Sequence, residues 1–261
     1  MSTPIGIVVA FVGIIGGMIL EGGNPAELFT HPAPLVLVFL GTLGATMAGV
    51  QMGDIGTVFK AAMKTFKGSK AKPAQVVEEL VGFADVARRE GLLALEEKVK
   101  SVEDEFLKRA LEQVIDGADP EAVEDTLHGE LAAMKKRHAV AQKFWADAGG
   151  YAPTVGIIGC VIGLMHVMHY LQYPEKLGPL ISAAFIATLW GVLSANVIFL
   201  PFANRLKRDT AAEVAYKELI IEGVLSIQSG ASPRALGDRL KSSLPPKVRE
   251  TIGGKGEKKA A

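Results

Sequence analysis

Four long apolar runs divide this chain of 261 residues. They lie at residues 4–20, 34–50, 151–171 and 177–202, and none of them contains Asp, Glu, Lys or Arg. About 20 apolar residues are enough for a helix to cross the hydrocarbon core of a bilayer, and lipid offers no partner to unpaired backbone groups. The pattern therefore predicts four transmembrane helices, the last two of which form a hairpin.

The segment between the second and third runs has the periodicity of amphipathic helices. Apolar residues recur at steps of three and four residues from 74 to 87 and again from 92 to 114. Asp119 followed by Pro120 is typical of a helix start, and we expect this helix to continue into the third apolar run. Because no alternation typical of strands occurs, the fold class is predicted to be all-α.

The tail after the fourth run is predicted to extend that run as a helix to about residue 229. A turn at 230–233 leads to a short helix over 234–243, and the proline pair and Gly/Lys-rich end beyond it are expected to be disordered. The predicted parts are transmembrane helices 1 and 2 (1–52), a helical cytoplasmic domain (53–148), transmembrane helices 3 and 4 (149–203) and a helical cytoplasmic tail (204–261).

Charge is segregated along the chain, although the net charge is zero and the mean hydropathy is +0.29. Residues 1–59 contain no Lys or Arg, whereas residues 60–143 contain 15 and residues 205–259 contain 12. The positive-inside rule places both basic regions and the N-terminus in the cytoplasm. The first run has no basic stretch before it and no convincing cleavage site after it, so we interpret it as a retained span.

The predicted spans contain no ionisable Asp, Glu, Lys or Arg, although such groups usually mark ion pathways in membranes. If this chain conducts ions, the titrating carboxylate must come from another polypeptide. His166 and His169 lack a third metal ligand, and the single cysteine, Cys160, suggests neither a disulfide nor a metal site. No phosphate-binding loop or nucleophile–base pair occurs, so neither an enzyme nor a cofactor is predicted.

Several polar side chains lie within the third and fourth runs. Each alone would most often bond a carbonyl of its own helix, but together they favour one hydrated face. These residues are Thr154, Ser182, Thr188, Ser194 and Asn196.

Pro153 and Pro201 lie at the predicted cytoplasmic ends of the third and fourth spans. Each removes a helix hydrogen bond and is a candidate hinge, although proline near the end of a span is common. Gly156, Gly159 and Gly163 recur at three- and four-residue steps, which allows close approach of another helix.

Charges of both signs surround Gly91 in the cytoplasmic segment, from Arg88 and Arg89 to Glu96 and Glu97. The residues alone favour a solvated surface with local ion pairs, each contributing about 0–1 kcal/mol. A docking surface for a cytoplasmic partner is the alternative.

Three motifs together resemble the MotA family, the channel-forming stator subunits of the bacterial flagellar motor, in the MotA/TolQ/ExbB superfamily. The motifs are Ala152-Pro153-x-x-Gly156-Ile157-Ile158-Gly159-x-x-x-Gly163-Leu164, Phe185-Ile186-Ala187-Thr188-x-x-Gly191 followed by Asn196 and Pro201, and Gly41-Thr42-Leu43-Gly44-Ala45. Four spans with a long second loop match the family's layout over nearly the whole chain.

The resemblance implies a multi-pass protein of the bacterial inner membrane that converts ion flow into torque on the rotor. It implies a homopentamer around a dimer of a MotB-like, single-span partner that carries the ion-binding aspartate. In the family, an Arg and a Glu eight residues apart engage the rotor's switch ring. Arg88 and Glu96 have that spacing, and Arg89 is an accessory candidate.

The same resemblance assigns Pro153 and Pro201 to the coupling of ion passage to movement, and Thr188 to the pore. Cys160 stands where sodium-driven members resemble one another in having Thr. A thiol is a poor ligand for a hard cation, so protons are favoured over sodium, although Thr154 or the partner remains an alternative source of oxygen.

Two other functions remain open from the sequence. The first is an energiser of outer-membrane transport of the ExbB/TolQ type, whose chains resemble a three-span layout with the large loop after span 1. The second is a membrane scaffold that conducts nothing. The predicted four-span layout favours the stator.

Overall fold

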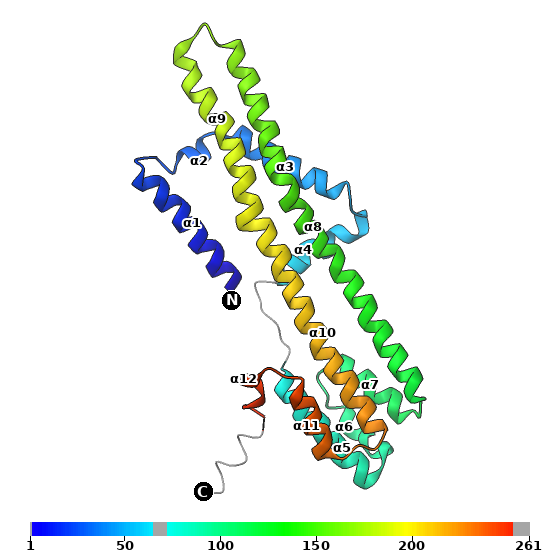
Figure 1. Cartoon of the computed structure of the whole chain (residues 1–261). Coiled ribbons are helices and arrows are strands. Elements are labelled where there is room, and N and C mark those ends of the chain that lie inside the picture. The colour runs from blue at the N-terminus through cyan, green and yellow to red at the C-terminus, as the bar shows by residue number, and fades with distance from the viewer. Residues whose placement is uncertain (1, 65–71, 253–261) are drawn as a thin grey trace. The chain divides into compact units, whose positions relative to one another are not determined.

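The computed structural model describes residues 2–64 and 72–252, and every regular element in these ranges is a helix (Figure 1). The all-helical prediction is therefore confirmed. The chain forms two compact units: the first comprises residues 1–68 and 137–209, and the second comprises residues 69–136 and 210–261. Two long helices, α8 (Pro120–His169) and α10 (Leu200–Gln228), each contribute to both units.

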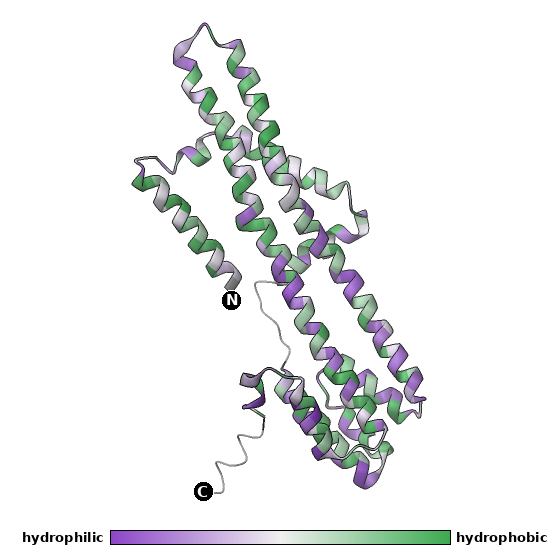
Figure 2. Ribbon diagram, in the orientation of Figure 1, coloured by the Kyte–Doolittle hydropathy of each residue, from purple (hydrophilic) through white to green (hydrophobic). Residues whose placement is uncertain are grey.

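The first unit carries the apolar runs as helices. Besides its parts of α8 and α10, it contains α1 (Ser2–Leu20), α2 (Glu27–Thr30), α3 (Pro32–Met47), α4 (Met52–Lys64) and α9 (Pro174–Leu193). Figure 2 shows hydrophobic residues along most of α1 and α9 and many hydrophilic ones along the first part of α8.

Three helical stretches are long and apolar enough to cross a membrane. They lie in α1, in α8, and in α9 with its continuation into α10. The expected second span is also helical, but α3 has only 16 residues. At 1.5 Å per residue it is about 24 Å long, somewhat less than a hydrocarbon core of about 30 Å.

The predicted continuity of the two longest helices is confirmed. Helix α8 begins at Pro120 and passes through Pro153 without interruption. Helix α9 runs directly into η2 (Ser194–Phe199), a six-residue π-helix, and then into α10. The π-helix ends two residues before Pro201, whose ring nitrogen donates no hydrogen bond to the turn before it. The sequence analysis did not predict this π-helix.

Aromatic side chains hold the first unit together at two points. The ring of Trp145 lies 5.3–5.9 Å from those of Phe59, Phe144, Phe199 and Phe202. Such pairs contribute about 0.5–1.5 kcal/mol each beyond the apolar area that they bury. This cluster joins α4, α8, η2 and α10.

The second aromatic contact lies around Trp190 of α9. Its indole Nε1 donates a 2.9 Å hydrogen bond to the carbonyl oxygen of Leu28. Its ring lies 5.6 Å from that of Phe29 and 5.8 Å from that of Phe39. The contacts of Trp190 therefore hold α2 and α3 against the hairpin.

Helices α8 and α9 approach each other backbone to backbone. A Cβ atom added to Gly156 would lie 2.8 Å from the carbonyl oxygen of Ala187, and one added to Gly191 would lie 2.7 Å from that of Ala152. Real Cβ atoms essentially never come so close to backbone oxygen. Only glycine fits at these two crossings.

The same contact continues along α8 at Gly159 and Gly163. An added Cβ would meet the Cβ of Ala187 or Ala184, respectively, at 2.8 Å. Small residues thus line both sides of the contact, as expected for helices that associate within lipid.

The second unit has a larger apolar core. It contains α5 (Pro73–Glu90), η1 (Leu92–Leu95), α6 (Glu96–Val99), α7 (Glu105–Ile115), α11 (Pro233–Ser242) and α12 (Pro246–Arg249), with the remaining parts of α8 and α10. Periodic apolar residues of α5 are buried as their spacing predicts, and the fully buried centre includes Leu80, Leu107, Leu111, Leu127 and Ile220.

Two secondary-structure predictions for the second unit are wrong. Residues 92–114 do not form one helical stretch, because the chain forms the short helices η1 and α6 and the residues between α6 and α7 are not helical. Residues 246–249 are helical rather than disordered, since the Arg249 guanidinium donates to the carbonyls of Leu244 and Ser242 at 2.6 Å. The Gly/Lys-rich end, 253–261, lies outside the described residues.

Asp104 explains why α7 starts where it does. One carboxylate oxygen accepts hydrogen bonds from the backbone N–H groups of Phe106 and Leu107, at 2.9 and 3.0 Å. The other accepts the Tyr216 hydroxyl of α10 at 3.0 Å. Burial, together with the negative charge of Asp104, raises the pKa of Tyr216, so the phenol remains a donor throughout the physiological range.

Replacing Asp104 is expected to destabilise the second unit. Asp104→Ala removes a helix cap and leaves the half-buried Tyr216 hydroxyl without its hydrogen-bond acceptor. Removal of the cap alone lowers the free energy of unfolding by about 0.5–2 kcal/mol. Hydrogen exchange of the backbone amides at the start of α7 should accelerate by the factor that corresponds to this loss of free energy. Glu103→Ala, which removes an adjacent exposed acid outside the cap, is the matched control and should leave exchange unchanged.

Gly156→Ala is expected to loosen the hairpin, because the new methyl group meets backbone rather than a flexible side chain. Overpacking of this kind typically costs about 1–3 kcal/mol. The thermal stability of the protein purified in detergent measures this loss. Gly150→Ala on the same helix has open space around its Cβ and serves as the control. Equal stability of the two variants would contradict the close contact.

Candidate functional site

The candidate pore residues lie on the hairpin of the first unit. Thr188 is half-buried on α9, and its Cα lies 3.3 Å from the position of a Cβ added to Gly156. Cys160 is half-buried on α8. Thr154 is exposed, and its hydroxyl donates to the carbonyl of Tyr151 at 2.7 Å.

Two further polar residues of the predicted hydrated face bond to their own helix. Ser194 is fully buried, and its hydroxyl donates to the carbonyl of Gly191 at 3.2 Å. The Asn196 amide donates to the carbonyl of Val192 at 2.9 Å, while the side chain remains exposed. These bonds leave the oxygens of the exposed side chains of Thr154 and Asn196 free to accept further hydrogen bonds.

Pro153 and Pro201 are both half-buried, each within a continuous helix. Pro201 is the second residue after η2, so the hydrogen-bond pattern of this helix is already altered on its N-terminal side. Pro153 lies in the same turn as Thr154 and Gly156, three residues before the close crossing with α9. Sequence periodicity alone did not locate the π-helix, which is the clearest structural irregularity near Pro201.

The hairpin also presents an apolar surface that nothing within the described chain covers. Four residues of α8 that face away from α9 are each 50–55% exposed: Ile157, Ile158, Val161 and Ile162. Exposed apolar residues also follow α1, where Val8, Val9 and Val12 are 60–65% exposed. In an aqueous protein such surfaces would mark an interface, and in a membrane protein lipid or partner helices cover them.

The glycine-rich motif of α3 also contacts the hairpin. A Cβ on Gly41 would lie 2.9 Å from a side-chain methyl of Val155 on α8. Beside it, Thr42 is fully buried, and its hydroxyl has no hydrogen-bond partner among the described residues.

The second candidate site is the charged turn at the end of α5. Arg88 and Arg89 occupy the last helical turn, where cations interact favourably with the helix dipole. Gly91 ends the helix with φ of 88°, a left-handed conformation that favours glycine, and Glu96 begins α6. The backbone turn therefore places Arg88 and Glu96 on two different helices.

Arg88, Arg89 and Glu96 are all exposed. Arg89 pairs with Asp85 at 3.0 Å on its own helix. Within the part of the chain that the structure describes, Arg88 and Glu96 form no ion pair, so their charges are presented to solvent. Leu93, at 74% exposure, lies between them in the sequence.

His166 and His169 lie at the end of α8 and are exposed. The His166 ring lies 5.3 Å from that of Tyr170, and the ranges 2–64 and 72–252 hold no group of three metal-ligating side chains.

Two family models match the chain. A model of the MotA/TolQ/ExbB proton channel family matches residues 98–219, and a model of the N-terminal part of motility protein A matches residues 4–91. The second match favours the motility branch of the superfamily over the transport energisers.

Individual relatives agree with the family models. Motility protein A of Bacillus subtilis is 38% identical over 260 residues, which cover 98% of this chain and 95% of that protein. A flagellar MotAB stator complex from Bacillus subtilis contains a chain with a TM-score of 0.90 and 37% identity, covering 97% of this chain and 100% of that one.

A chain of the C. jejuni MotAB structure gives a TM-score of 0.90 at 31% identity, covering 94% of this chain and 96% of that one. In each comparison the match extends over nearly the full length of both chains. The family is one of membrane channel subunits rather than enzymes. The chain belongs to the motility protein A family of flagellar stator subunits, within the MotA/TolQ/ExbB proton channel family.

Proposed function

We propose that the chain crosses the inner membrane four times, with α3 as a short second span and both termini in the cytoplasm. The absence of Lys and Arg from residues 1–59 and their concentration in 60–143 and 205–259 support this topology. A slight thinning of the bilayer or packing against the hairpin accommodates a 16-residue helix at modest cost.

The chain assembles as a homopentamer around a dimer of a MotB-like, single-span partner. The exposed apolar residues of α1 and α8 support an assembly within the membrane, since they give each copy surface for neighbours, partner and lipid. The lack of any carboxylate inside the apolar runs supports a partner that carries the ion-binding acid. Two structurally similar chains come from MotAB complexes.

Thr154, Cys160 and Thr188 line the ion pathway that this assembly encloses. Exposed Thr154 and half-buried Thr188 offer hydroxyl oxygen, while Cys160 offers a thiol that binds hard cations poorly. The transported ion is therefore the proton, taken up and released by the partner's aspartate.

Pro153 and Pro201 convert that titration into movement of the hairpin. A proline within a continuous helix leaves one carbonyl without its usual partner, and a π-helix replaces the usual i→i+4 hydrogen bonds with i→i+5 ones. Both features lower the cost of local bending beside the glycine contact.

The cytoplasmic turn transmits this movement to the rotor through Arg88 and Glu96, with Arg89 as an accessory. The single observation that carries this assignment is that Arg88 and Glu96 are exposed, unpaired among described residues and separated by the Gly91 turn. One charge crossing 100 mV releases about 2.3 kcal/mol. An exposed ion pair contributes about 0–1 kcal/mol, so each passage suffices to break and remake such a contact.

Charge reversal tests the rotor contact. In cells whose native copy of this gene is deleted, Arg88→Glu with Glu96→Lys should leave filaments normal and membrane levels of the protein unchanged, but swimming should be abolished. Lys100→Glu, an exposed charge beyond this turn, is the matched control and should swim. Wild-type swimming of the double variant would refute the role of the turn.

The nature of the ion is tested separately. At constant membrane potential and pH, replacing sodium with potassium in the medium should leave swimming speed unchanged, whereas a protonophore should stop it. A speed that falls with sodium would contradict the proton assignment and would point to hydroxyl oxygen, from Thr154 or the partner, as the cation ligand.

A further inference from the structure

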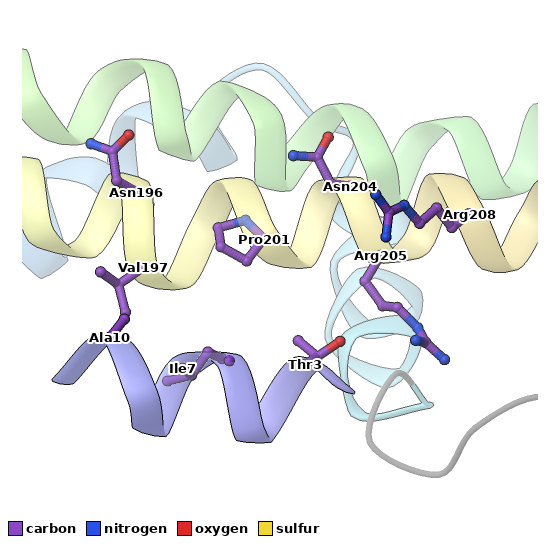
Figure 3. Close-up of a pocket in the computed structure, with 10 residues that line it drawn as sticks. Thr3, Ile7, Ala10, Asn196, Val197, Pro201, Asn204, Arg205 and Arg208 are labelled. Carbon is purple, nitrogen blue, oxygen red and sulfur yellow. The ribbon is translucent and has the colours of Figure 1, made fainter. Parts of the chain in front are cut away.

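A cleft of about 460 Å³ separates α1 from η2 and the start of α10 (Figure 3). One part of its lining is apolar and is formed by Ile7, Ala10, Val197 and Pro201. The other part is polar and is formed by Thr3, Asn204, Arg205 and Arg208, while the polar Asn196 lies next to Val197 at the apolar end. This volume is within the range of about 300–1,000 Å³ that is typical of sites for small organic ligands.

The two kinds of lining are arranged along the helices. Figure 3 shows Ile7 and Ala10 of α1 facing the helix that carries Val197 and Pro201, while Arg205 and Arg208 lie nearer the Thr3 end. The cleft thus has an apolar part between two membrane helices and a basic end.

The basic end carries two guanidinium groups, and only that of Arg208 has no acidic partner among the described residues. Among the described residues that line the cleft there is no Asp or Glu. Arg205 donates through Nε to Asp209 at 3.0 Å, on its own helix. The side chains of Asn204 and Arg208 have no hydrogen-bond or ion-pair partner among the described residues, and both are exposed.

We infer that this cleft binds an anionic phospholipid. The phosphate lies at the guanidinium groups of Arg205 and Arg208, the Asn204 amide donates to phosphate or glycerol oxygen, and one acyl chain lies along Ile7, Ala10 and Val197. Basic pockets between transmembrane helices on the cytoplasmic side are the sites where anionic headgroups bind. Charge complementarity selects an anionic lipid over a zwitterionic one.

The lipid adds to a limited contact that α1 makes with its own unit, where Phe11, Ile14 and Met18 are partly buried against the apolar cluster that includes Trp190. None of the 18 residues of the apolar window of α1 is buried within the chain. Gly13 and Gly17 of this helix have nothing within 4 Å of an added Cβ. A bound lipid therefore bridges α1 to the helix that contains Pro201. The lipid site depends on the proposed insertion in the membrane and not on the proposed rotor contact. The lipid site and the rotor contact can therefore fail independently.

Native mass spectrometry of the purified stator complex, titrated with phosphatidylglycerol, tests the site. Arg208→Gln is expected to lower the affinity about fivefold, since each basic residue near a headgroup contributes about that factor. Lys207→Gln removes the same charge from an exposed neighbour outside the cleft and should leave the affinity unchanged. Equal losses in both variants would overturn the inference.

A second variant tests the acyl part of the cleft without changing charge. Gly6 lines the cleft and has open space around an added Cβ, so Gly6→Leu is expected to fold and to displace the lipid chain. Retention of phosphatidylglycerol by this variant would place the lipid elsewhere.

Three further outcomes would also overturn the inference. Phosphatidylcholine that binds as tightly as phosphatidylglycerol would show that the site does not select an anionic lipid, and glycerol phosphate that displaces the lipid would show that the site binds free phosphate instead. A photo-crosslinking residue in place of Ala10 that couples to a second copy of the chain would show that a neighbouring helix fills the cleft. Crosslinking to phosphatidylglycerol supports the site.

Discussion

The first unit depends on the contact between the backbones of α8 and α9. Lipid tails are as apolar as leucine, so these helices gain nothing from hiding apolar surface from each other and must associate through close packing. Gly156 and Gly191 provide that packing, because each faces a carbonyl oxygen of the other helix at a distance that no Cβ atom tolerates. The contact also brings Thr188 beside the turn that contains Pro153, so the candidate ion pathway and hinge are held by the same few residues.

Helical irregularity is concentrated on the hairpin's second helix. Regular hydrogen bonding gives way to the π-helix at Ser194–Phe199 and is interrupted again by Pro201. The aromatic contacts of Phe199 and Phe202 with Trp145 fix this stretch to α8. Aromatic packing thus anchors the irregular part of this helix to its neighbour.

The chain supplies a scaffold and contacts rather than a titrating group. Its apolar runs lack carboxylates, and the charges of Arg88 and Glu96 are exposed at a turn of the second unit, where an ion pair is weak. Weak pairs are an advantage for a stator, since a contact that must be broken at every step cannot cost more than the ion supplies. The family's need for a second subunit follows from this division of roles.

The sequence by itself determined the helical class, the apolar runs, the continuity of α8 through Pro153 and the small residues of the hairpin. These features follow from local periodicity and composition, which act over a few neighbouring residues. The sequence did not determine the interruption of the helical pattern at Asp104. The Tyr216 hydroxyl that donates a hydrogen bond to the Asp104 carboxylate lies 112 residues away along the chain. The Trp190 bond to Leu28, the π-helix before Pro201 and the basic cleft beside α1 likewise depend on contacts between distant segments, which only the tertiary structure brings together.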